Sequence, residues 1–436
     1  MTLPPVYVST RAGSPAVSLS EAIAQGLAPD GGLYVPDRLP QVELQGFGGL
    51  EGLPAIARHA LDGFFRGDRL QSRLGEVAAA ALNLAAPTTP VTAAADPLLV
   101  LELYHGPTAA FKDFGARFLA ESLERLEGGA ATPLTILVAT SGDTGGAVAA
   151  AFHRRPWVRV VILYPRGLVS PRQEQQLTCW GDNVTSLRVD GTFDDCQRLV
   201  KEAFVSTELR QRHRFSSANS INIGRLLPQM VYYVASSLEV QRRTGAHAAY
   251  IIPAGNLGNA FAAVWARALG LPIGRIVLAH NSNRTVPDYL QDGQWRPRPS
   301  VATLASAMDV GNPSNMERLR ALYPGWDALR GQLSALSIDD EAIRNRIRID
   351  HGELGRTWCP HTATAAEVYR RLPPAERQGQ PWVLVSTAHP AKFNEIVEPL
   401  IGEAVGVPAP LAALLRLPQH FHDVAPSLAA LAKALE

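Results

Sequence analysis

The chain has 436 residues, of which 46% are hydrophobic and 19% are charged, and its net charge is +1. This length suits two or three lobes with a large core, and a near-neutral sequence without a basic block argues against binding to nucleic acid or to an acidic membrane surface. The start lacks the basic and apolar regions of a secretory signal, and every apolar run stays below the about 18 residues of a membrane span. We therefore expect a cytoplasmic protein.

The first region, residues 1–95, is expected to mix short helices with turns. Apolar spacing predicts helices at 19–26 and 53–65, and a Pro/Gly turn at 29–32 lies between them. The Ala/Pro/Thr-rich stretch 85–95 indicates a connection to the rest of the chain.

From Leu98 onward, short apolar and β-branched runs alternate with helical spacing. The expected strands are 134–139, 158–163, 186–189, 275–280 and 382–386, and the expected helices are 147–153, 193–204, 224–243, 362–372 and 427–435. A further strand–turn–helix unit is expected from 250 through 253 to 269. Apolar strands separated by helices are typical of parallel sheets covered on both faces. The sequence therefore predicts an α/β fold with more than one sheet.

Cysteine is scarce in this chain. Cys179, Cys196 and Cys359 are too few and too scattered for a disulfide framework or a zinc site. We expect no metal site, and we expect the three thiols to be buried as small hydrophobic groups in a reduced cytoplasm, although a reactive-thiol role stays open.

Lysine is also rare, since only four of the 41 basic residues are lysines. Lys112 lies in the run HGPTAAFKDF, and the others are Lys201, Lys392 and Lys433. Arginine stays protonated and forms no imine, whereas a desolvated lysine can lose its proton and act as a nucleophile. Lys112 is therefore the first candidate for covalent chemistry, and a lysine that merely lies along the surface of a helix is the alternative.

Two predicted strand-to-helix turns are rich in small residues, namely ATSGDTGG at 139–146 and PAGNLGN at 253–259. Such turns bring backbone N–H groups and the positive end of a helix toward a phosphate or a carboxylate. Each alone is a weak signal, because Gly-rich strand-to-helix turns are common packing devices. Together with an unusual lysine, they suggest pyridoxal phosphate, which needs an amine for its aldehyde and a nest of amides for its phosphate, and an amino-acid substrate.

Longer motifs carry a resemblance to a known family. In chain order they are QGLAPDGGLYVP, HGPTAAFKDFG, SGDTGGAV, LYPRGLVSPRQEQQL, SANSINIGRL, PAGNLGN, AMDVGNPSN and STAHPAKF. Their identity and order resemble threonine synthase, a member of the fold-type II, tryptophan-synthase-β-like group of pyridoxal phosphate enzymes. The resemblance extends from Gln25 to about Phe393.

The resemblance implies a fold and a division of the chain. Two open, twisted, mostly parallel sheets flanked by helices would follow an N-terminal extension. Residues 1–95 would form a threonine-synthase-type region and 96–235 a smaller α/β domain with the Schiff-base lysine. Residues 236–436 would form a larger α/β domain with the cofactor-phosphate loop.

The resemblance also implies roles for individual residues, with pyridoxal 5'-phosphate as the cofactor. Lys112 would be the Schiff-base lysine, and Thr387 would meet the pyridine nitrogen, with Ser386 as the neighbour that could be confused with it. The implied cofactor-phosphate loop consists of Gly255, Asn256, Leu257, Gly258 and Asn259. The loop implied around the substrate carboxylate and the cofactor O3′ consists of Thr140, Ser141, Gly142, Asp143 and Thr144. The residues implied to hold the substrate phosphate are Asn219, Ser220 and Arg225.

Several of these roles keep an alternative. Relatives in the broader group have asparagine at the position of Asp143, so a carboxylate there would need a proton or a nearby cation. Asp113 would orient the local backbone or cap the next helix. The histidines His105, His361 and His389 have packing or hydrogen-bonding alternatives to a role in the site, and Lys392 is a weaker imine candidate than Lys112.

The implied reaction converts O-phospho-L-homoserine and water to L-threonine and phosphate, by γ-elimination followed by β-addition of water, and Lys112 would move the protons. A phospho-amino-acid lyase or a dehydratase of the same fold is the alternative enzyme. A non-catalytic sensor of a phosphorylated metabolite is the alternative from another class. Both monomer and homodimer stay open.

Overall fold

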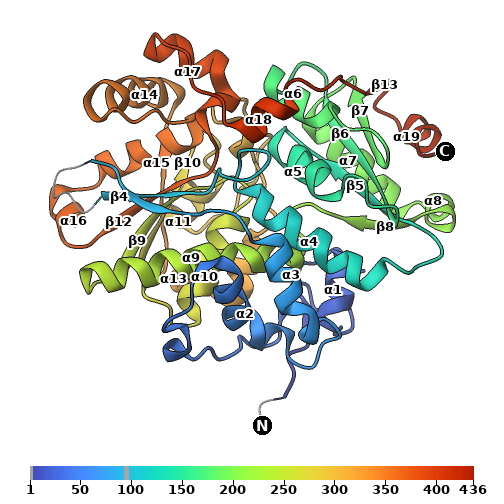
Figure 1. Cartoon of the computed structure of the whole chain (residues 1–436), viewed down its shortest axis with the longest axis horizontal. Coiled ribbons are helices and arrows are strands. Elements are labelled where there is room, and N and C mark those ends of the chain that lie inside the picture. Colours follow the sequence, from blue (N-terminus) through green and yellow to red (C-terminus); the bar gives the residue numbers. More distant parts are fainter. Residues whose placement is uncertain (1–2, 93–97) are drawn as a thin grey trace.

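The computed structural model describes residues 3–92 and 98–436, and its strands form two large sheets and one small ribbon (Figure 1). The ribbon pairs β1 (Tyr7–Ser9) with β2 (Tyr34–Pro36) in antiparallel fashion. The six-stranded sheet has the order β11-β10-β9-β12-β4-β3. Its strands are β3 (Thr88–Pro90), β4 (Leu98–Glu102), β9 (Ala248–Pro253), β10 (Ile273–His280), β11 (Ser334–Ser337) and β12 (Trp382–Ser386).

The five-stranded sheet has the order β13-β7-β6-β5-β8, and all of its neighbouring strands are parallel. Its strands are β5 (Leu134–Ala139), β6 (Val158–Pro165), β7 (Val184–Val189), β8 (Arg214–Ser217) and β13 (His422–Val424). In the six-stranded sheet only β3 runs antiparallel to its neighbour. Every residue of β5, β9 and β12 is buried, as expected for strands that helices cover on both faces.

The helices surround both sheets (Figure 1). The α-helices are α1 (Leu19–Gln25), α2 (Gly52–Phe65), α3 (Leu74–Ala81), α4 (Lys112–Glu127), α5 (Asp143–Phe152), α6 (Pro171–Thr178), α7 (Phe193–Val205), α8 (Thr207–Arg212), α9 (Ile223–Thr244), α10 (Gly258–Ala268), α11 (Thr285–Asp292), α12 (Met316–Leu322), α13 (Trp326–Arg330), α14 (Asp340–Leu354), α15 (Pro360–Arg371), α16 (Pro374–Gln378), α17 (Asn394–Ile401), α18 (Ala409–Leu414) and α19 (Leu428–Leu435). Short 3-10 helices are η1 (Leu44–Phe47), η2 (Gln71–Arg73), η3 (Ser306–Met308) and η4 (Pro390–Phe393). None of those helices, which lie in residues 3–92 and 98–436, combines the length and apolarity that a bilayer crossing requires.

Helix α9 is the longest helix and runs through the middle of the molecule (Figure 1). Its first turn is fixed because Asn222 accepts a hydrogen bond from the Gly224 N–H at 2.8 Å. Gly245 ends it in the left-handed conformation, with φ of 72°. Helices α2, α4 and α10 pack against α9, so this helix joins the N-terminal region to both sheets.

The predicted α/β class with mostly parallel sheets is confirmed, and strands 134–139 and 382–386 match β5 and β12. Helix α5 begins at Asp143, four residues before its predicted start, because the Gly-rich turn already forms its first turn. Apolar spacing left the segment 285–360 without predicted elements, where the structure has the short helices α11, α12 and α13, the strand β11 and the 15-residue helix α14. Residues 85–95 contain β3 and are therefore more than a connection, while 93–95 lie outside the described residues.

The three-region division stays a prediction. Each large sheet contains strands from more than one of these regions. Strand β4, assigned to the middle region, pairs with β12 in the six-stranded sheet. At the other end of the chain, β13 pairs with β7, and α19 packs on α7 beside the five-stranded sheet. Burial of all three cysteines is confirmed, and each is a free thiol.

Candidate active site

Lys112 is the first residue of α4, at the end of the loop that follows β4. Backbone hydrogen bonds fix this loop against the turn after β12: the Phe111 N–H donates to the Thr387 carbonyl at 2.8 Å, and the His389 N–H donates to the Ala109 carbonyl at 3.0 Å. Within the described part of the chain, Nζ of Lys112 has no hydrogen-bond partner and lies 5.9 Å from the centre of the Phe111 ring. The amine is therefore held in place through its backbone and is free at its tip.

Asp113 orients the backbone around Lys112, which is one of the two roles expected for it from the sequence. Its carboxylate accepts hydrogen bonds from the Thr108 N–H at 2.9 Å and from the Thr108 hydroxyl at 2.7 Å. A Cβ atom on Gly106 would lie 2.3 Å from this carboxylate, so only glycine fits there. Burial raises the pKa of Asp113 to about 6, against the lowering effect of its bonds to Thr108.

A second lysine lies in the site. Lys392 of η4 is 1% exposed; its Nζ lies 2.9 Å from Oδ1 of Asp143 and donates to the Thr108 carbonyl at 2.7 Å. Sequence reasoning ranked Lys392 below Lys112 because no apolar flank isolates it. The sequence did not indicate that Lys392 pairs with Asp143. The rarity of lysine was the available signal, and it applied to Lys392 as well as to Lys112.

Asp143 is the first residue of α5. The nearby cation that a carboxylate at this position requires is Lys392. Burial by itself raises the pKa of this carboxyl, but Lys392 and Lys112 lower it more strongly, so the pKa lies below its usual value. Gln173 donates to Oδ1 at 3.0 Å. The carboxylate is therefore ionised and held by both neighbours.

The turn at 139–146 is held in shape by a side chain of its own. The Thr140 hydroxyl oxygen accepts hydrogen bonds from the Gly142 and Gly145 N–H groups, both at 3.0 Å. This hydroxyl therefore shapes the first turn of α5. Ser141 and Thr144 are half-buried, and the start of α5 is a suitable place for an anion.

Gly142 has φ of +130°, and a Cβ atom on it would lie 2.6 Å from Nε2 of Gln173. We expect Gly142→Ala to strain the backbone by about 1–3 kcal/mol and to push Gln173 away from Asp143. A lowered midpoint of thermal unfolding, together with weaker substrate binding, would be observed. Gly129→Ala is the control, because a Cβ atom at that position has nothing within 4 Å, and equal stability of the two variants would contradict this assignment.

Electrostatics at Lys112 favour a neutral amine. Burial lowers the pKa of Lys112 to about 8; Asp143 opposes this shift, whereas Arg225 and Lys392 add to it. A lysine with such a pKa is present in part as the free base near neutral pH, which a proton carrier requires.

The predicted cofactor-phosphate loop joins β9 to α10, and Leu257 within it has φ of 64°. Oδ1 of Asn259 accepts hydrogen bonds from the hydroxyls of Tyr232 at 2.6 Å and Tyr233 at 2.8 Å. Two donors on Oδ1 orient the amide, so Nδ2 is the atom left to donate. Nδ2 is buried and has no partner within the described residues.

Asn256 links this loop to two others. Its Nδ2 donates to the Ser220 hydroxyl at 2.7 Å, and its Oδ1 accepts from the Ser314 N–H at 2.6 Å. The loop also approaches η3 closely, because a Cβ atom on Gly255 would lie 2.7 Å from the Cα of Met308. Asn256 and Gly255 thus shape the loop, and Gly258 keeps room beside Ser220.

Among the predicted substrate-phosphate residues, Ser220 contacts this loop through Asn256. Arg225 is 2% exposed, and its Nη1 donates to the Ala218 carbonyl at 2.6 Å. Among the residues described, its Nε has no partner, and the same holds for the buried Oδ1 of Asn219. A Cβ atom on Gly115 of α4 would lie 2.7 Å from the Arg225 carbonyl, so Arg225 and the helix of Lys112 are in contact.

Arg318 is a further buried cation that sequence reasoning missed. It donates to the Asn315 side chain at 2.6 Å and to carbonyls of Ile221 at 2.7 Å and Tyr34 at 3.1 Å. Burial lowers the pKa of Arg318 to about 9, so it remains a cation at neutral pH. It ties the N-terminal region to the loop of Ser220; no sequence signal identified it.

Ser386, the last residue of β12, and Thr387, which follows it, differ in their contacts. The Ser386 and Thr362 hydroxyls share a hydrogen bond at 3.1 Å. Thr387 is 5% exposed and its hydroxyl has no partner in residues 3–92 and 98–436. The geometry therefore favours Thr387 over Ser386 as the partner of a bound ring nitrogen, and this role stays a prediction.

The three candidate histidines have different partners. Nε2 of His105 lies 2.9 Å from Glu102, and His389 packs edge-on against Tyr104. Nε2 of His361 accepts from the Ala307 N–H at 3.1 Å, and burial lowers the pKa of His361 to about 4. His361 is therefore neutral with its proton on Nδ1.

The residues of the site fit a phosphorylated aldehyde cofactor. Of the ten unpaired buried side-chain N and O atoms among the described residues, four belong to candidate site residues, namely Oδ1 of Asn219, Nε of Arg225, Nδ2 of Asn259 and Nδ1 of His361. Buried polar groups normally have partners, so these four atoms leave hydrogen-bonding capacity for a polar guest. A primary amine, Lys112, lies in the same region.

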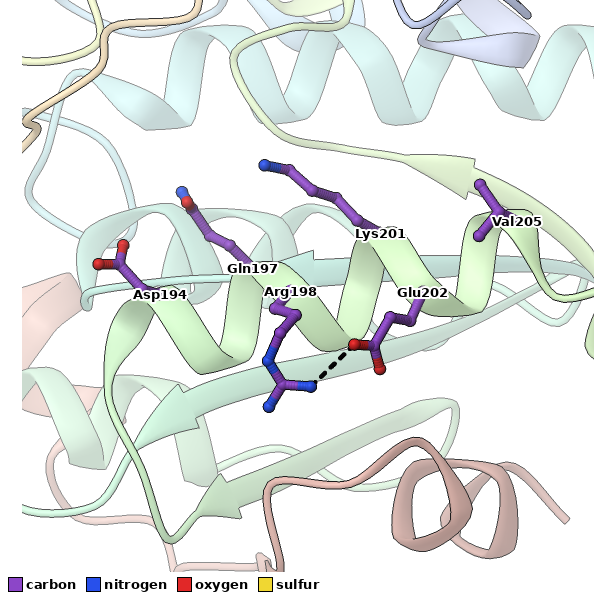
Figure 2. Close-up of a pocket in the computed structure, with 6 residues that line it drawn as sticks. All are labelled: Asp194, Gln197, Arg198, Lys201, Glu202 and Val205. Atoms are coloured by element: carbon purple, nitrogen blue, oxygen red, sulfur yellow. Dashed lines mark hydrogen bonds and ion pairs between the residues drawn. The ribbon is translucent and has the colours of Figure 1, made fainter. Parts of the chain in front are cut away.

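A separate hollow of about 470 Å³ lies on the outer face of α7 (Figure 2). Its lining residues all belong to this one helix; they are Asp194, Gln197, Arg198, Lys201, Glu202 and Val205. Their side chains point in different directions, and Arg198 pairs with Glu202 at 2.9 Å. This is a solvated helix face, without the unpaired buried atoms that mark the site of Lys112.

Comparison with known proteins gives matches over most of the chain. A model of pyridoxal-phosphate dependent enzymes matches residues 86–388, and models of the threonine synthase N terminus and C-terminal part match 6–81 and 362–435. The threonine synthase of Escherichia coli is 42% identical over 421 residues, which are 96% of each chain.

Solved structures agree with these matches. The crystal structure of threonine synthase from Escherichia coli covers 99% of both chains with a TM-score of 0.90 at 40% identity. That of pyridoxal-phosphate-bound threonine synthase from Brucella melitensis has a TM-score of 0.89 at 31% identity and covers 99% of this chain and 98% of its own. The fold and the site thus define a pyridoxal-phosphate-dependent enzyme of fold type II. Within that class, the chain belongs to the threonine synthase family, which confirms the resemblance of the motifs.

Proposed function

We propose that this chain converts O-phospho-L-homoserine and water to L-threonine and phosphate. The observation that carries the proposal is the burial of the Lys112 amine, which lowers its pKa to about 8, within electrostatic range of Asp143 at the start of α5 and of Arg225 on α9. When bound, pyridoxal phosphate stabilises the negative charge that forms once a proton leaves the α-carbon of an amino acid.

Lys112 serves first as the anchor and then as the proton carrier. Its neutral form accepts the α-proton, and its ammonium form returns protons at the adjacent carbons. The side chain has the freedom for this because its tip has no hydrogen-bond partner among the described residues, while the Thr387 and His389 contacts hold its backbone.

The other residues bind and orient the substrate. The start of α5, with Thr140, Ser141, Gly142, Asp143 and Thr144, receives the α-carboxylate, and Asn219, Ser220 and Arg225 receive the substrate phosphate. Unpaired atoms on Asn219 and Arg225 support this assignment. Gly255, Asn256, Leu257, Gly258 and Asn259 receive the cofactor phosphate, supported by the free Nδ2 of Asn259.

The proposal also covers the cellular location of the enzyme, its partners and its oligomeric state. A net charge of +1 without a basic block supports a cytoplasmic enzyme that works without nucleic acid or membrane. A monomer and a homodimer both agree with this proposal.

Product analysis tests the proposed function. Holoenzyme incubated with O-phospho-L-homoserine is expected to release threonine and phosphate in equal amounts. The alternative phospho-amino-acid lyase or dehydratase would give 2-oxobutyrate without threonine, and that outcome would overturn the proposal. A protein that binds phosphohomoserine without turnover would be the sensor.

A further inference from the structure

The motifs of the sequence assign no role to Lys392, yet the structure buries its ammonium group at the centre of the site. Residues 108 and 392 are 284 positions apart in the chain, and Nζ of Lys392 joins them by its 2.7 Å bond to the Thr108 carbonyl. The same Nζ lies 2.9 Å from Asp143, whose side chain is 4% exposed. A buried ion pair therefore connects η4, the loop of Lys112 and the start of α5.

Hydrogen bonds from neighbouring segments hold this ion pair in place. Gln173 of α6 donates to the same oxygen of Asp143, and Gln176 donates to the Thr108 carbonyl at 3.1 Å. The Ser170 hydroxyl donates to the backbone carbonyl of Lys392 at 3.3 Å. A buried pair with such satisfied neighbours is held in one arrangement, and removal of one charge leaves the other uncompensated.

The charges that act on Lys112 come from several elements. Asp143 of α5 is the anion, and Arg225 of α9 and Lys392 of η4 are the cations. His361 of α15 lies close enough to feel the charges of Lys112 and Asp143 but is itself neutral, and Asp113 on α4 is engaged by Thr108. Asp143 and Lys392 therefore act on the nitrogen of Lys112 in opposite directions.

We propose that Lys392 is a positioning residue for the reaction: its ammonium group neutralises Asp143 and fixes the loop of Lys112, and the ion pair sets the charge around the Lys112 nitrogen. The inference rests on the proposed function, because it assigns Lys112 as the anchor and proton carrier. The ion pair also explains how an aspartate, Asp143, is accommodated in the turn 139–146, where relatives in the broader group have asparagine. Without a paired cation, a buried carboxylate would repel an incoming substrate carboxylate.

A set of three variants tests this inference through the visible absorbance of the holoenzyme, titrated with pH. The midpoint of that titration reports protonation of the Lys112 nitrogen. Lys392→Met leaves Asp143 as an uncompensated anion, so the midpoint is expected to rise by roughly one pH unit, and Asp143→Asn leaves an uncompensated cation, so the midpoint is expected to fall by a similar amount. The double variant has neither charge, and its midpoint is expected to lie between those of the single variants.

Lys201→Met is the matched control, because Lys201 stands exposed on α7 (Figure 2). A residue with a merely structural role would lower the temperature of unfolding without moving the midpoints in opposite directions, and that result would overturn the inference. Should Lys392→Met fail to fold, the comparison of Asp143→Asn with the double variant decides, because removal of the Lys392 charge from the Asp143→Asn background must raise the midpoint, and equal midpoints would overturn the inference.

Reduction of the holoenzyme with borohydride, followed by peptide mapping, separates this inference from the proposed function. The cofactor is expected on Lys112. A label on Lys392 would overturn the positioning role. A protein that takes up no cofactor would contradict the proposed function itself, whereas threonine formation with unshifted midpoints would contradict only the role of Lys392.

Discussion

Replacement of Lys112 by alanine is expected to lower kcat/KM for phosphohomoserine by about 10⁴-fold, because one group that transfers protons contributes up to about this factor and Lys112 also anchors the cofactor. The absorbance of the covalently attached cofactor should be lost in the same variant. The fold should persist, since Asp143 and Lys392 stay paired without Lys112. Steady-state kinetics and the absorbance spectrum measure both effects.

Lys433→Ala and Lys201→Ala provide controls, since both lysines lie outside the site and Lys201 is exposed. They are expected to keep the activity and the spectrum of the original chain. Retention of threonine formation in Lys112→Ala at more than about one hundredth of the original rate would contradict the assigned role, because the remaining lysine in the site, Lys392, is held by Asp143.

Arg225→Met is expected to lower kcat/KM by about 100-fold, mainly through a higher KM. Truncating a buried charge that meets a phosphate costs about 2–5 kcal/mol. The unpaired Nε of Arg225 is the donor that the substrate phosphate would use. Methionine keeps much of the side-chain volume, so packing against α4 changes little. Initial-rate kinetics give the two constants, and inhibition by inorganic phosphate should weaken in parallel.

The control for this variant is Arg242→Met, an exposed arginine near the end of the same helix. It is expected to leave kcat and KM unchanged. If Arg225→Met raised only the fraction of unfolded protein and left KM unchanged, Arg225 would be a structural residue, and the substrate phosphate would bind elsewhere.

Much of the fold follows from local pattern. Strand β5 and helix α7 were predicted nearly to the residue, because a short apolar run and a helical spacing are each complete within their own segments. The segment 285–360 was not predicted. Several of its elements are short and are held by contacts with distant parts of the chain, such as the hydrogen bond from Arg318 of α12 to the Tyr34 carbonyl at 3.1 Å.

The positions of the candidate site residues were predicted from motifs, and their partners were not. PAGNLGN indicated a phosphate loop, yet the tyrosine hydroxyls that orient Asn259 come from α9, where Tyr232 and Tyr233 read only as core residues of a helix. Arg318 likewise reads as a surface residue of a short helix, although it is fully buried.

The sequence by itself determined that Lys112 is an unusual amine in a chain with two glycine-rich turns, because each of these features is complete within a few residues of its own segment. Only the tertiary structure decided what surrounds that amine. Lys392 reaches Asp143 and Thr108 because η4, after the last strand of the six-stranded sheet, lies against the loop of Lys112 and the start of α5. Charge acts through space, so the chemistry of Lys112 depends on residues that no local pattern connects to it.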